Sequence, residues 1–418
     1  MYRVGGIFLF AVAACASALP RSASEGLLAD QSDQPVRIAL ATSARQAQFA
    51  SRGSWVIYNK NSEHVVTRGN ASRGVKVQLS GSRLVAIRDD GSVTSRYSGS
   101  FIFRSTTSGA LIRYDGKRYR GEIIVLPTDS GMLIINRLAV ESYLRGVVPL
   151  EIGDRKPGEE AAVEAQAVAA RSYSYVHMAE ARSRAFDMYG TVQDQVYGGA
   201  DAETPISDNA IVATRDMVLR YAGKIINTPY HSTCGGSTAA AQEVWWREPN
   251  QPYLQPVSDR IAGTNSFYCD PSPLFKWNAT FQKEALRATL EKYLAQYSSG
   301  PSGSVGAVTG VRTEGRTPSD RVSAITIQTT RGNYLVRGNA IRFVLRSPAG
   351  AILNSTYFTV ETTVDGAGEV ETLTLDGGGN GHGIGMCQWG AIGRARAGQS
   401  YRTILTTYYP GTTVGRID

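Results

Sequence analysis

A single carboxylate, Glu151, stands between two segments of different pattern. An apolar run at residues 147–149 precedes it and ends in proline, and a loop at residues 153–158 separates it from an alanine-rich stretch. Proline tends to end a strand, because it lacks a backbone donor and restricts the residue before it. We therefore expect Glu151 just past a strand end and ahead of a helix. Catalytic residues are often found on loops that a rigid scaffold holds in place. Glu151 is therefore either a catalytic acid or base, or an ordinary solvated glutamate in a loop.

A second candidate is the glycine-rich segment 376–391, which carries His382, Gln388 and Trp389. It lacks the Gly-Lys-Ser/Thr ending of a phosphate loop and an acidic residue at the dinucleotide-binding spacing. Its glycines would instead let the backbone approach a sugar chain or pack tightly. The three side chains offer polar and stacking contacts that suit sugars. The alternative interpretation is a buried loop that closes on the core.

A third candidate combines His231 and Cys234, spaced as H-x-x-C, with Cys269 further along the chain. An imidazole and two thiolates could hold zinc, with water or another residue in the fourth position. A disulfide between Cys234 and Cys269 is the competing interpretation, and it needs only an oxidising compartment. That pairing would leave Cys387 as a free thiol. A third interpretation is that these residues form neither a zinc site nor a disulfide.

The composition narrows the class of protein. Charged residues make up 19% and hydrophobic residues 42% of the 418 residues, which fits a folded protein rather than a disordered one. The net charge of +8 is scattered and raises affinity for anionic polymers or surfaces. No basic helix or nucleic-acid motif accompanies it, so we exclude a nucleic-acid partner. An anionic cell-wall glycan or an anionic membrane surface would be attracted by this positive net charge.

The N-terminus has the pattern of an export signal. One arginine precedes an apolar stretch at residues 7–14 that is too short to span a bilayer. Residues 12–15 resemble a lipobox in which Cys15 would be lipidated, whereas residues 16–18 fit cleavage after Ala18. We expect an exported protein of the cell envelope (periplasm, cell wall or lipid-anchored). Contact with a membrane would come only through the N-terminal anchor.

The elements that must position these residues mix strands and helices. Short apolar or alternating runs separated by turn signals fill residues 36–138, and a similar pattern returns at residues 308–360. Helices are expected at residues 159–183, 205–222 and 281–296. The helix at 159–183 has a narrow face of small residues that allows close packing. We predict an α+β fold with mixed, largely antiparallel sheets and a few packed helices.

The same patterns divide the chain into parts. We expect a signal peptide or lipoprotein signal at 1–18, a linker at 19–33, an N-terminal strand-rich part at 34–137, and a core at 138–415 with a strand-rich insertion at about 300–370.

Several blocks in one order resemble the SpoIID/LytB family, which contains sporulation stage II protein D and the amidase-enhancer proteins. The blocks are VESYLRGVVPLEI at 140–152, AQAVAARSY at 165–173, HSTCGG at 231–236, GHGIGMCQWGA at 381–391 and YYPGT at 408–412. Separate blocks in one order are more specific than any single block. The family carries methionine where Ile152 stands and usually serine where Cys387 stands.

The resemblance implies a peptidoglycan lytic transglycosylase with a SpoIID/LytB-like catalytic core. Such an enzyme needs a proton donor for the glycosidic oxygen, and burial against apolar groups would keep that donor protonated. A second carboxylate is not required, because the C6 hydroxyl of the sugar can close an anhydro ring while the same glutamate acts as base. On the resemblance, Glu151 is the general acid/base. The proposed reaction requires no cofactor. Whether the protein holds a structural zinc ion is left open at this point.

Three other residues have two interpretations each. Gln166 and Arg171 in the alanine-rich helix either bind the glycan or brace the Glu151 loop, since a buried arginine needs a carboxylate or carbonyl partner. Glu141 is a rival carboxylate, for which we favour a helix-start or capping role.

Two rival functions follow from the same sequence. A non-enzymatic amidase enhancer would bind cell wall or a partner amidase without using Glu151, and one fold can host either role. A zinc-dependent wall hydrolase would use His231, Cys234 and Cys269. The resemblance further implies that the enzyme prefers glycan strands already stripped of peptides and acts after an amidase.

Overall fold

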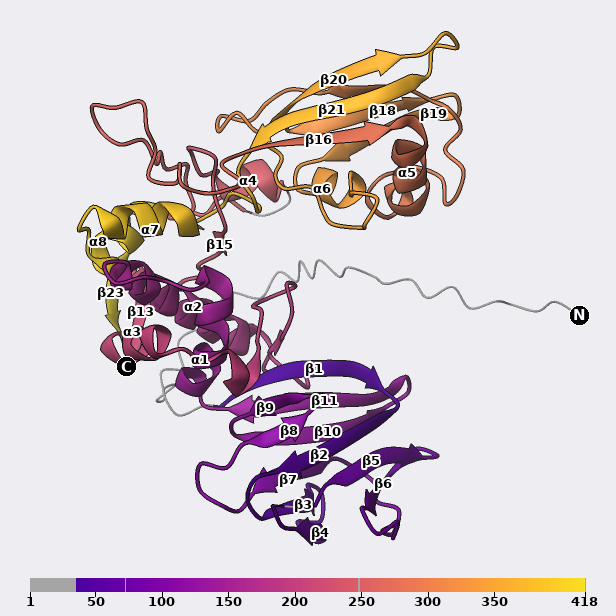
Figure 1. Ribbon diagram of the computed structural model, residues 1–418, viewed down its shortest axis with the longest axis vertical. Helices are drawn as coiled ribbons and strands as arrows, with labels where there is room; N and C mark the ends of the chain where they lie inside the picture. The colour runs from indigo at the N-terminus through magenta and orange to yellow at the C-terminus, as the bar shows by residue number, and fades with distance from the viewer. Residues whose placement is uncertain (1–34, 72, 247–248, 418) are drawn as a thin grey trace, which may run out of the picture.

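The computed structural model describes residues 35–71, 73–246 and 249–417. The expected signal sequence, the linker and Cys15 lie outside these ranges. Figure 1 shows an N-terminal body of strands at one end, a helical body in the middle and a second strand-rich body at the other end. Helices and mostly antiparallel sheets are mixed, so the predicted α+β class is confirmed. Among the described residues, no helix has the length and apolar character needed to cross a membrane.

The N-terminal body consists of a seven-stranded sheet, in the order β12-β1-β11-β10-β7-β3-β4, and a five-stranded sheet, in the order β6-β5-β2-β8-β9. The sequence of β5 shows why strands of this kind form a sheet with one face on the core: Val75 and Val77 are buried, whereas Lys76 between them is partly exposed. The strands are β1 (Val36–Ala44), β2 (Gln46–Ser51), β3 (Trp55–Asn59), β4 (Val65–Gly69), β5 (Val75–Ser80), β6 (Arg83–Arg88), β7 (Phe101–Ser105), β8 (Ile112–Tyr114), β9 (Lys117–Tyr119), β10 (Glu122–Thr128) and β11 (Gly131–Leu138).

The helical body is built around α2 (Glu160–Glu180), which contacts α1, α3, α7 and α8. Small side chains such as Ala162, Ala165 and Ala169 are fully buried and let the neighbouring helices approach. The other elements are α1 (Val140–Ile152), β12 (Met188–Tyr189), η1 (Gly199–Ala202), α3 (Pro205–Ala213), β13 (Met217–Tyr221), β14 (Lys224–Ile225), β15 (Tyr230–His231), α4 (Ala241–Val244), β22 (Met386–Cys387), α7 (Gln388–Arg396), α8 (Tyr401–Tyr408) and β23 (Thr413–Arg416).

Two strand pairings bring the end of the chain back to this body. β22 pairs in parallel with β15, which places residues 386–387 beside residues 230–231. β23 pairs with β13 in the antiparallel sense. The HSTCGG and GHGIGMCQWGA blocks, far apart in sequence, therefore lie side by side.

The second strand-rich body contains the sheets β16-β21-β20 and β17-β18-β19, with α5 and α6 packed against them. It has its own hydrophobic core, which includes Leu286, Leu290 and Leu294 of α5. The body runs from β16 to β21, and its bounds are wider than the predicted insertion at about 300–370. Its elements are β16 (Lys276–Gln282), α5 (Lys283–Tyr297), β17 (Val308–Thr313), β18 (Ala324–Thr329), β19 (Gly332–Arg337), α6 (Ala340–Val344), β20 (Phe358–Val364) and β21 (Val370–Gly378).

The local predictions have mixed outcomes. The helices expected at 159–183 and 281–296 are α2 and α5, whereas the helix expected at 205–222 ends at Ala213. The strand expected to end at Pro149 is wrong, because residues 140–152 form helix α1. Apolar residues at positions 140, 143, 144, 147 and 148 follow helical spacing and are buried. Pro149 lies in the C-terminal part of this helix, three residues before its end.

Candidate functional site

Glu151 lies in the last turn of helix α1. The sequence-based prediction that it lies in a loop after a strand is therefore wrong. The helix ends at Ile152 and Gly153 caps it. The φ of 73° at Gly153 suits glycine, and the Gly153 amide donates a hydrogen bond to the Pro149 carbonyl. Glu151 as a residue is partly buried, and its carboxylate Oε1 accepts a hydrogen bond of 2.8 Å from the Val196 backbone amide. Burial raises the pKa of Glu151 to about 7, and the Val196 hydrogen bond opposes that rise.

Tyrosine side chains surround this carboxylate. Burial, followed by the charge of Glu151, raises the pKa of Tyr143 and that of Tyr230 well above the usual range. Gln195 links the two rings, because its Oε1 accepts a 3.1 Å hydrogen bond from the Tyr143 hydroxyl and its Nε2 donates a 3.0 Å bond to the Tyr230 hydroxyl. Since both phenols stay protonated, these two neighbours of Glu151 are neutral.

The segment before η1 supplies the hydrogen-bond donor to Glu151. Asp194 anchors it by accepting hydrogen bonds from the Tyr189 amide (2.8 Å) and the Tyr173 hydroxyl (3.0 Å). Gly146 of α1 lets the same segment approach, since a Cβ there would lie 2.5 Å from the Tyr197 ring and 2.7 Å from the Gly199 carbonyl oxygen. This close contact positions the Val196 amide over the end of α1.

Arg171 has no exposed surface, and it forms a two-pronged ion pair with Glu141 at 2.7 and 2.8 Å. A further bond of 3.1 Å goes to the Met217 carbonyl. Arg171 thus ties α2 to the first turn of α1 and to β13, and we assign it a bracing role in place of the predicted glycan contact. Glu141 lies in the first turn of α1, as expected, but the start of this helix has no side-chain capping hydrogen bond, and Glu141 is instead the partner in that brace.

Gln166 and Gln388 pair with each other. The Gln388 Nε2 donates a 3.1 Å hydrogen bond to the Gln166 Oε1, and both side chains are buried. This bond fastens α7 to α2, so these two residues also brace the fold in place of the predicted sugar contacts. The glycine-rich segment therefore closes on the core, at least at Gln388.

Trp389 and His382 are both partly exposed, and His382 Nδ1 accepts a 3.0 Å hydrogen bond from the Ile384 amide. The Arg155 guanidinium lies 5.6 Å from the Trp389 ring centroid, which places Trp389 beside the loop that follows Glu151. His382 packs against Trp245 with 5.3 Å between ring centroids. Burial, followed by the charge of Arg342, lowers the pKa of His382 to about 3, so the ring is neutral near pH 7.

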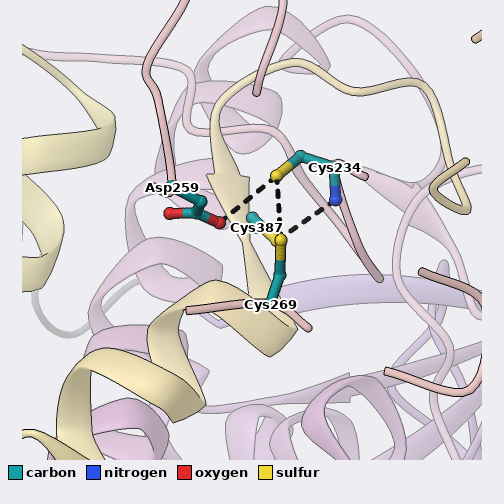
Figure 2. Close-up of side chains that lie close together, drawn as sticks. All are labelled: Cys234, Asp259, Cys269 and Cys387. Atoms are coloured by element: carbon teal, nitrogen blue, oxygen red, sulfur yellow. Dashed lines mark hydrogen bonds between the residues drawn. The ribbon is translucent and has the colours of Figure 1, made fainter. Parts of the chain in front are cut away.

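The cysteines gather in a way that the sequence does not show. Cys234, Cys269 and Cys387 are buried thiols, and the carboxylate of Asp259 joins them (Figure 2). The Sγ atoms of Cys234 and Cys269 are 3.5 Å apart, compared with about 2.05 Å in a disulfide. The disulfide expected between them is therefore not formed in the structure.

His231 does not belong to this group, although the sequence pairs it with Cys234 and Cys269 as a zinc ligand. Its Nδ1 lies 3.1 Å from the Ile384 carbonyl oxygen, and its Nε2 is buried without a hydrogen-bond partner among the described residues. Asp259 and Cys387 take its place beside the two sulfurs. Cys387 could have been found as the serine-to-cysteine departure from the family block, whereas nothing in the sequence singles out Asp259, Gln195 or Val196.

Comparisons with known proteins agree with the sequence blocks. A family model described as Stage II sporulation protein matches residues 128–221, and one described as a domain of unknown function (DUF8618) matches residues 260–385. A protein of Brachyspira hyodysenteriae, named only as uncharacterized, is 30% identical over 301 residues, which cover 72% of this chain and 73% of the relative.

Two relatives from Bacillus subtilis (strain 168) carry descriptive names. The amidase enhancer is 31% identical over 342 residues, which cover 72% of this chain but only 45% of the relative. Stage II sporulation protein D is 28% identical over 300 residues, covering 68% of this chain and 76% of the relative. The chain therefore belongs to the SpoIID/LytB family.

Proposed function

We propose that this protein cleaves the glycan strands of peptidoglycan as a lytic transglycosylase, with Glu151 as general acid and base. Membership in a family of sporulation and amidase-enhancer proteins supports a peptidoglycan-related role in the cell envelope. One observation carries the finer proposal: Glu151 is partly accessible, yet burial raises its pKa to about 7. Such a carboxyl group is protonated often enough near neutral pH to donate a proton, and its anion is basic enough to recover one.

The proposed reaction needs one carboxyl group. Glu151 donates its proton to the glycosidic oxygen as the bond from that oxygen to C1 breaks, and positive charge develops at C1. The C6 hydroxyl of the same sugar then attacks C1, and the Glu151 carboxylate removes its proton. The product has a 1,6-anhydro ring, no water is consumed, and Glu151 is protonated again.

The residues around Glu151 have separate roles in this proposal. The Val196 amide holds one carboxylate oxygen, so the other oxygen is free to face the substrate. Trp389 and His382 are the proposed sugar contacts, because both are partly exposed and offer an aromatic face or a neutral imidazole. Gln166, Arg171 and Gln388 hold the helices that carry these groups.

The test is digestion of purified, peptide-stripped glycan strands, followed by mass analysis of the chain ends. The wild-type protein should give anhydro ends, Glu151→Gln should give none, and the matched variant Glu164→Gln on α2 should behave as wild type. Thermal stability of both variants at or above that of wild type would show that activity is lost without unfolding. Reducing ends would contradict the transglycosylase and favour a hydrolase.

A second function has support of its own, namely the 31% identity to the amidase enhancer. In that case the protein binds cell wall or a partner amidase and raises the rate of the amidase. No anhydro ends from the wild-type protein, together with faster amidase digestion of intact walls that Glu151→Gln preserves, would support this function and reject the first.

A further inference from the structure

We propose that Cys234, Asp259, Cys269 and Cys387 form a closed, four-ligand zinc site that holds the loop before β16 to the helical body. One ligand atom from each residue lies within 4.8 Å of all the others. None of the four residues has measurable solvent exposure. Figure 2 shows the three sulfur atoms and a carboxylate oxygen pointing toward one another from separate parts of the chain.

The spacing of these atoms fits a tetrahedral zinc ion. Bonds of about 2.3 Å from zinc to sulfur at tetrahedral angles would place the sulfurs about 3.8 Å apart. The Sγ atoms of Cys234 and Cys269 are 3.5 Å apart, and the Cys234 Sγ lies 3.2 Å from Asp259 Oδ2. Thiolates with one hard oxygen ligand favour zinc over magnesium or calcium, which prefer all-oxygen sites.

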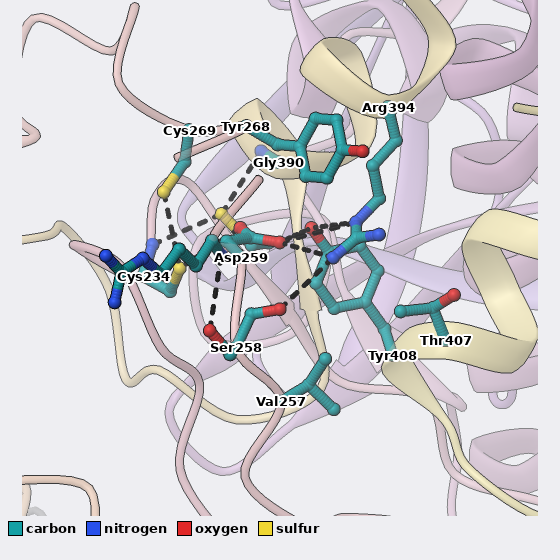
Figure 3. Close-up of polar contacts among 12 residues, drawn as sticks. Cys234, Val257, Ser258, Asp259, Tyr268, Cys269, Gly390, Arg394, Thr407 and Tyr408 are labelled. Carbon is teal, nitrogen blue, oxygen red and sulfur yellow. Dashed lines mark hydrogen bonds and ion pairs between the residues drawn. The ribbon is translucent and has the colours of Figure 1, made fainter. Parts of the chain in front are cut away.

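The carboxylate of Asp259 is oriented as a ligand would be. Its Oδ1 accepts a 2.5 Å hydrogen bond from the Tyr408 hydroxyl and a 3.1 Å bond from the Arg394 guanidinium, so Oδ2 is left toward the sulfurs (Figure 3). Outer partners of this kind fix metal-binding carboxylates. Gly390 makes room for the arrangement, because a Cβ there would lie 2.1 Å from Asp259 Oδ2.

The sulfurs also have backbone donors suited to thiolate charge. The amides of Cys234 and Gly390 each donate to the Cys387 Sγ at 3.2 Å, and the Gly236 amide donates to the Cys234 Sγ at 3.4 Å. Hydrogen bonds to a charged acceptor stabilise the charged form. Three thiolates and one carboxylate would carry four negative charges, of which a divalent cation and Arg394 neutralise three. Without a cation, that much buried negative charge would be unfavourable.

A redox pair explains less of this geometry. A disulfide between Cys234 and Cys269 would need the sulfurs to move from 3.5 Å to about 2.05 Å and would consume an oxidant. It would leave Cys387 and Oδ2 of Asp259 without a role. Zinc binding instead uses all four groups and releases the thiol protons to water.

Four protein ligands leave no open coordination position, so the proposed zinc is structural and does not activate water. Its ligands join three segments: the turn after β15 (Cys234), the loop between α4 and β16 (Asp259 and Cys269) and β22 (Cys387). Cys387 is also the N-cap of α7, where it accepts the Gly390 amide. The zinc would thus hold α7, and with it Gln388 and Trp389, against the rest of the site.

The test is the metal content of the full chain, purified without chelator and measured by elemental mass spectrometry and native mass spectrometry. We expect about one zinc per wild-type chain, the same content in His231→Asn, and at least a tenfold loss in Cys269→Ser and Asp259→Asn. Loss of zinc in His231→Asn with retention in Asp259→Asn would overturn the proposal. A metal-free wild-type chain with a disulfide between Cys234 and Cys269 would overturn it as well.

A spectroscopic measurement keeps the test valid where a variant fails to fold. Wild-type protein stripped of metal and loaded with Co²⁺ alone should show the visible bands of a tetrahedral site and a strong near-ultraviolet band from sulfur-to-cobalt charge transfer. Octahedral cobalt bands without charge transfer would contradict the four-ligand site. Because the readout is metal binding, it is independent of whether Glu151 cleaves glycan strands.

Discussion

The Val196 backbone amide lies 2.8 Å from the Glu151 carboxylate, although 45 residues separate the two positions in the sequence. This contact joins the end of α1 to the segment before η1, and it partly opposes the effect of burial on the pKa of Glu151. The protonation state of Glu151 therefore depends on how closely these two segments pack.

The first prediction concerns the pH dependence of glycan cleavage. Glu151 must be protonated to act first as an acid, and its pKa is raised to about 7. The value of kcat/KM should therefore fall as the pH rises through about 7, and it should fall tenfold for each further pH unit. Initial rates on peptide-stripped strands between pH 5 and 9 would check this. A constant rate across that range would contradict Glu151 as the acid.

The second prediction is the effect of the same group on stability. The folded-state pKa of Glu151 lies above its ordinary value of 4.5, so the folded state binds more protons than the unfolded state between about pH 4.5 and 7. Stability should fall across that window and level off above it. Glu151→Gln removes this penalty and should gain up to roughly 3 kcal/mol over wild type at pH 8, with little change at pH 4. Urea unfolding at both pH values measures the difference, and an equal gain at pH 4 and pH 8 would contradict the raised pKa.

The third prediction tests the brace between Glu141 and Arg171. Glu141→Gln leaves the fully buried guanidinium without its charged partner, which should cost on the order of 3 to 5 kcal/mol. The matched control is Asp201→Asn, which breaks the exposed pair with Arg118 and should cost less than about 1 kcal/mol. Denaturant unfolding of both variants would check the contrast, and similar losses would show that Arg171 does not depend on Glu141.

The fourth prediction concerns Gly146. A Cβ at this position would meet the Tyr197 ring and the Gly199 carbonyl, so Gly146→Ala should destabilise the fold by about 1 to 3 kcal/mol. It should also push the Val196 amide away from Glu151, which removes a contact that lowers the pKa and moves the alkaline limb of the pH profile upward. Gly366→Ala has open space around it and should change neither property. A loss of stability with an unmoved pH profile would show that Gly146 does not position Val196.

Local pattern was sufficient for some elements and misleading for others. Helix α2 follows from small and apolar residues at helical spacing, because side chains three or four positions apart share a face. The same spacing runs through α1, yet its valines and Pro149 favour a strand ending there. Burial on several sides of α1 overrides that preference.

Some features of the candidate site could likewise be predicted from the sequence, and others could not. Glu151 and the family blocks can be recognised from the sequence, because a carboxylate among apolar residues and an order of motifs are properties of neighbouring positions. The roles of Gln166, Arg171 and Gln388 cannot, since each depends on which partner the fold brings to it. The bracing role of Arg171 becomes visible only in the folded structure, where the buried Arg171 side chain forms an ion pair with Glu141.

The sequence by itself determined the family, the mixed α+β class and the glutamate that is the best candidate for proton transfer. Tertiary structure alone decided which groups surround that glutamate and which join the cysteines. Asp259, Cys269 and Cys387 are 25, 35 and 153 residues from Cys234, and β15 and β22 pair across a similar separation. Contacts over such distances arise from the packing of whole sheets and helices, which no local spacing of residues encodes.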